Sequence, residues 1–127
     1  NAIALSVEER VNLHLFGGKL DHHARFFFEP TMLETLRRIA FDAAFIGATA
    51  IAEDGVYFSY MEDAQVKQAA ALSARQVVVV SETEKFQIQA PYRGLELGQI
   101  DTLITDKKLA QTQKQWFPTK TDFLIGD

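Results

Sequence analysis

The sequence contains no cysteine. This absence excludes a disulfide framework, a thiolate nucleophile and any zinc site built on cysteine. Histidine is scarce as well, since His14, His22 and His23 are the only three. Adjacent histidines on a strand point to opposite faces, so this spacing does not favour a metal site. We therefore expect neither a metal ion nor any other cofactor.

Long hydrophobic runs and an excess of positive charge are also missing. No apolar stretch approaches the roughly 20 residues of a membrane span, and no secretion signal is visible. These absences predict a cytoplasmic protein that does not contact a membrane. Lysine and arginine number 13 against 17 aspartates and glutamates, which gives a formal charge of −4. A basic face for nucleic acid is not visible, so any contact with DNA needs another segment.

What is present is the composition of one globular domain. The chain has 127 residues, of which 47% are hydrophobic and 24% charged, enough for a substantial core. It begins at Asn1 rather than at methionine, so we expect a piece of a longer protein. Residues 1–9 carry the helical spacing of a broken element.

Apolar patterns along the chain alternate between the periods of strands and helices. Pro30 suits a first helical turn, Ser59 and Glu62 fit a capping box for a helix to about Ala74, and Asp106 suits the cap of a helix that ends at Pro118. The alternation predicts an α/β fold, with a mainly parallel, Rossmann-like sheet and helices on both faces. The expected strands are residues 11–16, 25–29, 42–46, 76–80, 100–105 and 123–125, with a loop or short extended piece at 87–98.

The stretch 41–51 predicts a strand that runs into a tight glycine turn. Residues 43–46 form a short apolar run, as in a parallel strand covered on both faces. Gly47 allows the turn, and Thr49 places a hydroxyl just past the carboxyl end of the strand. Ligands of open α/β sheets bind at such ends. The local pattern by itself favours the simpler alternative, a core strand and its turn.

Residues 42–48 read D-A-A-F-I-G-A and resemble the D-x-A-F-x-G-A signature of the C-terminal sensor domain of DeoR-type bacterial transcription regulators. That domain is related to ribose-5-phosphate isomerase and the glucosamine-6-phosphate deaminases. The isomerase pattern is D-G-A-D-E, and its acids perform the chemistry. Here Ile46, Thr49 and Ala50 stand at the acid positions. The resemblance therefore implies a site that binds a sugar phosphate without converting it.

Residues 77–86, V-V-V-V-S-E-T-E-K-F, resemble the strand and D-x-S-K-F motif of the same family. The lysine of the motif falls on Lys85, and the resemblance implies that it holds the ligand. Glu82 and Glu84 replace the Asp and Ser of the pattern. An ammonium just after a strand's carboxyl end is well placed for a phosphate. A solvated lysine among acids is the structural alternative.

Residues 62–67, E-D-A-Q-V-K, resemble the family's E-E-A-x-V-K helix. The isomerases have a catalytic carboxylate at the position of Val66, so a further acid is missing. Lys67 either adds positive charge to the site or pairs with Asp63 at i, i+4, worth about 0.3–0.5 kcal/mol. The sequence favours neither role over the other.

Three further resemblances are less specific. Gly17 and Gly18 resemble the family's G-G and allow close approach to a ligand, although a hairpin turn explains them too. Tyr57 stands where family members often have a Thr after the turn at Gly55, and Glu29 stands where they have a Gly. We expect both replacements to reshape the pocket. Residues 100–106 resemble I-D-x-x-I-T-D, whose acids we expect to be structural, and the Phe run 26–28 suits a sheet core or dimer face.

The resemblance covers residues 1–127 and begins within the family's pattern. Members carry an N-terminal winged helix-turn-helix, a first strand and a phosphate loop before the position of Asn1. The resemblance therefore implies that this chain is a fragment of an effector-sensing domain, truncated at its N-terminus, from a regulator of sugar-metabolism genes. Repressors of phosphotransferase-system operons, lactose type included, are members that fit. The implied ligand-binding residues are Gly47, Thr49, Lys85, Lys67, Gly17, Gly18 and Tyr57.

The partners that follow are a phosphorylated sugar, DNA through the absent N-terminal domain only, and further copies of the chain, because an exposed sheet edge invites pairing. Two other functions stay open. One is an isomerase- or deaminase-like enzyme, against which the missing acids argue. The other is an oligomerisation domain with a vestigial pocket.

Overall fold

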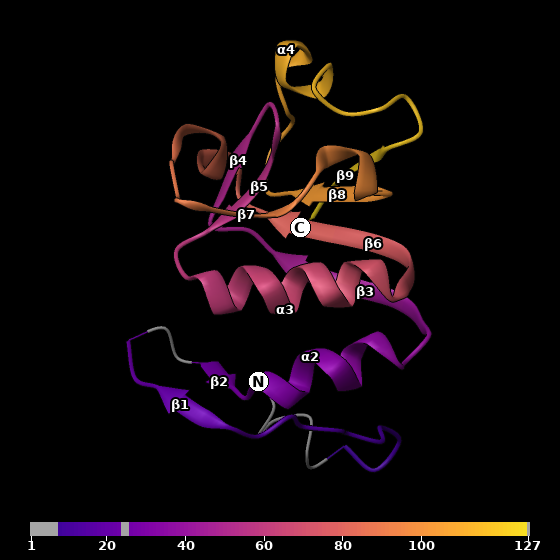
Figure 1. Ribbon diagram of the computed structural model, residues 1–127. Coiled ribbons are helices and arrows are strands. Elements are labelled where there is room, and N and C mark those ends of the chain that lie inside the picture. Colours follow the sequence, from indigo (N-terminus) through magenta and orange to yellow (C-terminus); the bar gives the residue numbers. More distant parts are fainter. Residues whose placement is uncertain (1–7, 24–25, 127) are drawn as a thin grey trace.

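A computed structural model describes residues 8–23 and 26–126 (Figure 1). The largest sheet has four parallel strands in the order β3-β6-β8-β9, and a second sheet has three antiparallel strands in the order β4-β5-β7. This arrangement confirms the predicted α/β class with a mainly parallel sheet. The strands are β1 (Lys19–Asp21), β2 (Phe26–Phe28), β3 (Phe41–Gly47), β4 (Ala50–Ala52), β5 (Gly55–Phe58), β6 (Ala74–Ser81), β7 (Tyr92–Leu95), β8 (Thr102–Thr105) and β9 (Asp122–Ile125).

Helix α3 (Met61–Leu72) lies along the parallel sheet, and α2 (Pro30–Arg37) packs on its outer side together with the β1–β2 hairpin (Figure 1). Met32 and Leu36 of α2 are buried against Ala69 of α3, which explains the helical spacing of these apolar residues. The remaining helical segments are short: η1 (Thr83–Gln87), η2 (Leu97–Gln99) and α4 (Gln111–Lys114). In the described part of the chain, no helix is long and apolar enough to cross a membrane.

The main core lies on one face of the parallel sheet. Crossovers between neighbouring parallel strands are right-handed, and these four strands follow one another in sequence order, so all their connections fall on the same face. Side chains of that face are buried with α3, the antiparallel sheet and the segments that follow β6 and β8. The buried cluster includes Ile46, Val79 and Leu103 from the strands, with Phe58, Ala64, Phe86, Leu95 and Phe117 from the covering segments.

The opposite face of the parallel sheet is open among the described residues. Phe45, Val80 and Leu124 are 72%, 46% and 53% exposed. The register places Val80 beside Ile104 and Ile104 beside Leu124, so these side chains share the face that the connections leave bare. The prediction that residues 43–46 are covered on both faces is therefore wrong, and the helices lie over one face. β3 is also an edge strand.

The strand predicted at residues 11–16 is not formed. This segment is irregular, and Val11, Leu13 and Leu15 are exposed. Alternating apolar residues form a strand only when a neighbouring strand takes their backbone hydrogen bonds, and no described segment pairs here. Gly18 instead opens the β1–β2 hairpin with a φ of +138°, where a Cβ would lie 2.6 Å from the carbonyl oxygen of Phe28. Of the element expected at 1–9, residues 1–7 lie outside the described part.

The predicted helix caps are also wrong. Tyr60, not Ser59, is the N-cap residue of α3, without a side-chain cap bond, and the helix ends before Ala74. Asp106 does not cap α4, because its carboxylate accepts the backbone N–H of Thr83 at 2.7 Å. The helix predicted up to Pro118 shrinks to the short α4. Asp101 accepts the N–H of Val77 at 2.8 Å, so both acids have the structural role that we expected, with partners on neighbouring segments.

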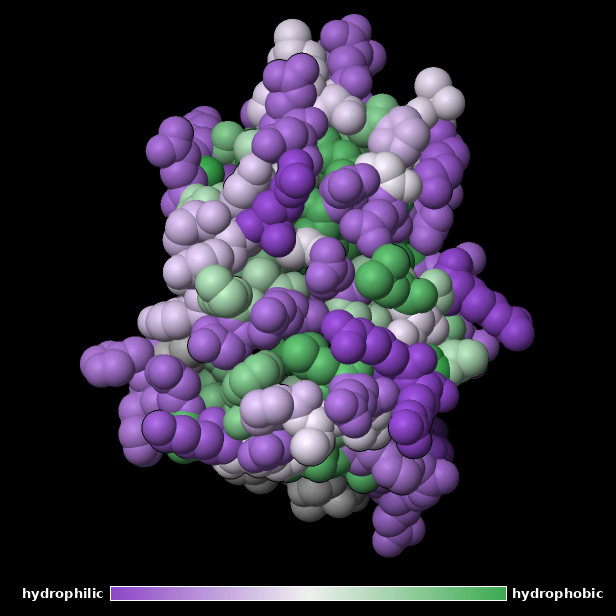
Figure 2. All heavy atoms as spheres, viewed as in Figure 1, coloured by the Kyte–Doolittle hydropathy of each residue, from purple (hydrophilic) through white to green (hydrophobic). Residues whose placement is uncertain are grey.

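The surface is mixed in character. On the face shown in Figure 2, hydrophilic residues cover most of the outer surface, and hydrophobic atoms show mainly between them. This pattern fits a globular domain in which several layers of secondary structure turn their apolar side chains toward a common core.

Candidate functional site

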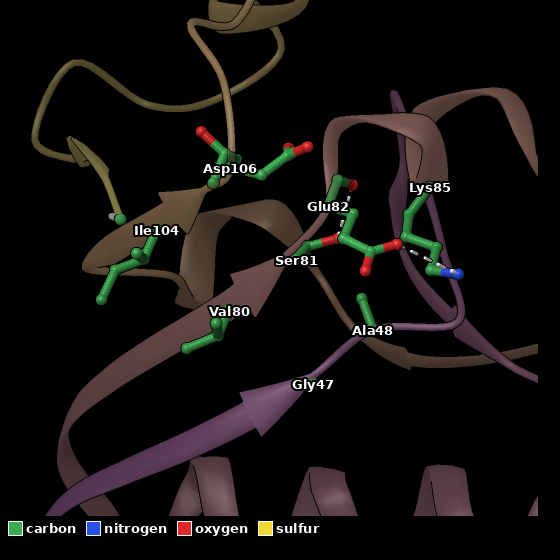
Figure 3. A pocket seen from close by; sticks show the side chains of 10 residues that line it. Gly47, Ala48, Val80, Ser81, Glu82, Lys85, Ile104 and Asp106 are labelled. Atoms are coloured by element: carbon green, nitrogen blue, oxygen red, sulfur yellow. Dashed lines mark hydrogen bonds and ion pairs between the residues drawn. The ribbon is translucent and has the colours of Figure 1, made fainter.

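A cavity of about 470 Å³ lies at the carboxyl ends of the four parallel strands (Figure 3). Parallel strands bring these ends to one edge of the sheet, which is where ligands of open α/β sheets bind. β3, β6 and β8 contribute their last residues to the wall, and Gly126 directly follows β9. The lining residues are Gly47, Ala48, Val80, Ser81, Glu82, Lys85, Ile104, Thr105, Asp106 and Gly126.

The turn after β6 places Glu82 and Lys85 in the wall of this cavity. Phe86 is buried, with ring centroids 5.9 Å from Trp116 and 6.3 Å from Phe117. Asp106 holds the start of the same turn through the N–H of Thr83. Fixed at both places, the turn presents Lys85 to the cavity (Figure 3).

The ammonium of Lys85 is already paired. Its Nζ lies 3.4 Å from Oε1 of Glu84 and 3.9 Å from Oε2 of Glu82. The lysine side chain is 29% exposed, whereas both carboxylates are largely exposed. Exposed ion pairs of this kind are worth roughly 0–1 kcal/mol. A ligand anion could therefore replace either carboxylate at little cost.

Asp106 adds negative charge to the opposite wall. The backbone N–H of Thr83 that its carboxylate accepts lowers the pKa of Asp106 below its ordinary value. Asp106 is therefore ionised at neutral pH. With Glu82 also in the wall, the described lining contains two carboxylates and one lysine, which gives it a formal charge of −1.

The two hydroxyl groups in the wall have their protons engaged. Ser81 Oγ donates to the carbonyl oxygen of Glu82 at 3.1 Å, and Thr105 Oγ1 donates to that of Lys107 at 2.7 Å. A hydroxyl has one proton and two lone pairs, so in this arrangement each hydroxyl offers its lone pairs to a ligand. Among the lining side chains that the structure describes, Lys85 is the cationic donor, and Glu82 and Asp106 are carboxylate acceptors.

Of the residues expected to bind ligand, Gly47 and Lys85 meet in this cavity. β3 continues through Gly47, and the bend falls at Thr49, so the prediction of a tight turn at Gly47 is wrong. Thr49 is half-buried and lies just past the lining residues. A Cβ on Gly47 would meet nothing within 4 Å. Neither the backbone conformation nor the surrounding atoms therefore require a glycine at position 47.

The other expected residues lie outside the cavity. Lys67 pairs with Asp63, with 3.5 Å between Nζ and Oδ1, and borders a smaller hollow of about 230 Å³ beside β3. The Tyr57 hydroxyl donates to Asp54 Oδ2 at 2.8 Å in the β4–β5 hairpin, which raises the pKa of Tyr57. Gly17 and Gly18 precede β1 and are not among the lining residues.

Several lining residues were not expected from the sequence. Ser81 and Thr105 are the last residues of β6 and β8, and their position at adjacent strand ends was a usable signal. For Asp106 the sequence predicts a helix cap instead. Its hydrogen bond with Thr83 joins segments 23 residues apart, so no local pattern could reveal it. Within residues 8–23 and 26–126, no group of three or more His, Asp or Glu could hold a metal ion.

The sequence matches a known family and two curated relatives. The family model described as the DeoR C terminal sensor domain matches residues 1–107. The HTH-type transcriptional repressor GlcR of Bacillus subtilis (strain 168) is 35% identical over 106 residues, which are 84% of this chain and 41% of the relative. A putative aga operon transcriptional repressor of Escherichia coli O157:H7 is 28% identical over 107 residues, 84% of this chain and 40% of the relative. The chain thus spans about two fifths of these relatives, and it belongs to the DeoR C-terminal sensor domain family.

Proposed function

We propose that this chain is the effector-sensing domain of a DeoR-type transcriptional repressor in the cytoplasm, and that a phosphorylated sugar binds the strand-end cavity. Family membership and the relatives' names support the regulatory role. The observation that carries the ligand proposal is the position of Lys85, whose ammonium lies at the carboxyl ends of the parallel strands. A phosphate there would exchange the weak pairs with Glu82 and Glu84 for a charge-assisted hydrogen bond.

The regulatory step is a shift between two states. In the full-length protein, a winged helix-turn-helix N-terminal to Asn1 would bind operator DNA. A sugar phosphate that binds one state more tightly shifts the population toward it by its difference in affinity. Such coupling is reciprocal, so operator DNA would change effector affinity by the same factor. Homo-oligomerisation through exposed sheet surfaces would place two DNA readers on one operator.

The same cavity supports binding rather than turnover. Ile46 and Ala50 occupy acid positions of the isomerase pattern and are buried in the core. Val66 replaces the helix carboxylate and packs against the α2–α3 cluster. General acid–base catalysis requires a group within hydrogen-bond reach of the transferred proton. The carboxylates present, Glu82 and Asp106, follow β6 and β8 and do not occupy those positions.

Thermal-shift and calorimetric screens of the full-length protein test this function. The panel should pair each hexose and pentose phosphate with its unphosphorylated sugar. We expect at least one phosphorylated sugar to bind saturably and to change operator affinity, and its unphosphorylated partner to do neither. Saturable binding without any effect on operator DNA would refute the regulatory half, and no binding across the panel would favour an assembly domain with a vestigial pocket.

A further inference from the structure

The hydrogen-bonding character of the strand-end cavity is strongly one-sided. Among the lining side chains, Lys85 is the donor, while Glu82 and Asp106 are carboxylates and the hydroxyls of Ser81 and Thr105 donate to backbone carbonyls. In this arrangement, the side chains described in the lining offer four acceptors and one cationic donor. A complementary ligand brings one anionic group and several donors.

We propose that Glu82 and Asp106 make the cavity selective for a sugar monophosphate with free hydroxyl groups and exclude a second phosphate. This inference rests on the proposed function, since it specifies the ligand class of the same site. The single phosphate takes Lys85. The sugar hydroxyls donate to the carboxylates and to the lone pairs of Ser81 and Thr105.

The selectivity follows from charge as much as from hydrogen bonding. The lining has a formal charge of −1, one lysine against two carboxylates. A first phosphate gains a charge-assisted contact with Lys85, but a second one would lie beside the carboxylates of Glu82 and Asp106, which repel it and cannot donate to it. Juxtaposed like charges are costly, and such repulsion is a common way to reject a wrong partner.

Glu84 provides a matched control for Glu82. Both carboxylates pair with Lys85, at 3.4 Å for Glu84 and 3.9 Å for Glu82. Glu82 lines the cavity, whereas Glu84 is not among the lining residues. Neutralising either one removes one of the two ion pairs of Lys85, but only the change at Glu82 should alter the response to a second phosphate.

The test is calorimetric titration of the full-length protein with ligands that differ by one phosphate. Suitable pairs are fructose 6-phosphate with fructose 1,6-bisphosphate, and ribose 5-phosphate with ribose 1,5-bisphosphate. For the wild type we expect the monophosphate of the binding pair to be favoured by about tenfold or more. Glu82→Gln should reduce that ratio about tenfold, because glutamine still accepts from a hydroxyl but no longer repels phosphate.

Two further variants complete the design. Asp106→Asn should reduce the ratio of the two affinities as Glu82→Gln does, because it also removes a charge that repels phosphate. The turn should stay in place, since the amide oxygen can still accept the N–H of Thr83. Glu84→Gln should change both affinities together and leave the ratio unaltered. A wild type that binds mono- and bisphosphate equally, or equal ratio changes in Glu82→Gln and Glu84→Gln, would overturn the inference and leave the proposed function standing. Absence of all sugar-phosphate binding would overturn both.

Discussion

The carboxylate of Asp106 accepts a hydrogen bond from the backbone N–H of Thr83 at 2.7 Å. This contact joins the end of β8 to the start of the turn that carries Lys85. It therefore couples the geometry of the candidate phosphate contact to the charge of an acid on a different segment.

The first prediction concerns pH. The N–H of Thr83 holds the pKa of Asp106 below its ordinary value, so the unfolded chain binds this proton more readily than the folded one. The contribution to stability is complete above the ordinary pKa and is lost as the pH falls through the lowered folded-state pKa. Urea unfolding midpoints of the wild type should fall across this acidic range more than those of Asp106→Asn. Parallel pH profiles for the two proteins would show that the ionisation of Asp106 contributes nothing to stability.

The second prediction concerns Lys85. In the full-length protein, Lys85→Ala should weaken sugar-phosphate binding about ten- to a hundredfold, because a charge-assisted contact is worth roughly 1.5–3 kcal/mol. The free energy of unfolding should change by less than about 0.5 kcal/mol, since the pairs lost are exposed. Calorimetric titration and denaturant melts measure the two effects side by side.

Two variants serve as controls for that experiment. Lys85→Arg should restore binding only in part, because a planar guanidinium does not reproduce a compact ammonium. Lys67→Ala should leave effector affinity unchanged, since Lys67 pairs with Asp63 outside the cavity. Loss of binding in Lys67→Ala together with normal binding in Lys85→Ala would move the phosphate contact to Lys67.

The third prediction is that the protein does not interconvert ribose 5-phosphate and ribulose 5-phosphate. Ile46 and Ala50 are buried apolar residues at positions where the isomerase pattern has acids, so no side chain there can transfer the proton. A coupled assay with purified full-length protein, run beside a true isomerase, measures this directly. Turnover proportional to protein concentration would contradict the assignment.

The fourth prediction separates sensing from DNA binding. Residues 1–127 alone, with a formal charge of −4, should bind operator DNA no more tightly than DNA of unrelated sequence. The full-length protein should bind it specifically, with an affinity that falls steeply as salt rises, because phosphate contacts release counterions. Electrophoretic mobility shifts over a salt series distinguish the two proteins. Tight, salt-dependent operator binding by the chain alone would show that the DNA reader lies within it.

Local sequence was sufficient where a pattern and its tertiary setting agree. The four valines 77–80 lie within β6, and Pro30 begins α2 as expected. Residues 42–47 of the D-A-A-F-I-G-A motif lie within β3, and Lys85 follows the neighbouring strand β6 at the same sheet edge. Alternation of strands and helices implied the parallel sheet, and a parallel sheet gathers its strand ends into one site.

Other features depended on contacts between distant segments. Residues 11–16 have the alternation of a strand but no described partner, so the pattern does not become one. Phe45 has the hydropathy of a core residue yet is 72% exposed, because sequence order placed every connection on the other face. Asp106 binds Thr83 rather than capping a helix, and Lys67 pairs with Asp63 away from the cavity. Local periodicity in the sequence determined the strands of the parallel sheet and the helices α2 and α3, together with the charged turn after β6. Only the tertiary structure decided which faces are covered and which charges meet, because these depend on the topology that joins distant segments.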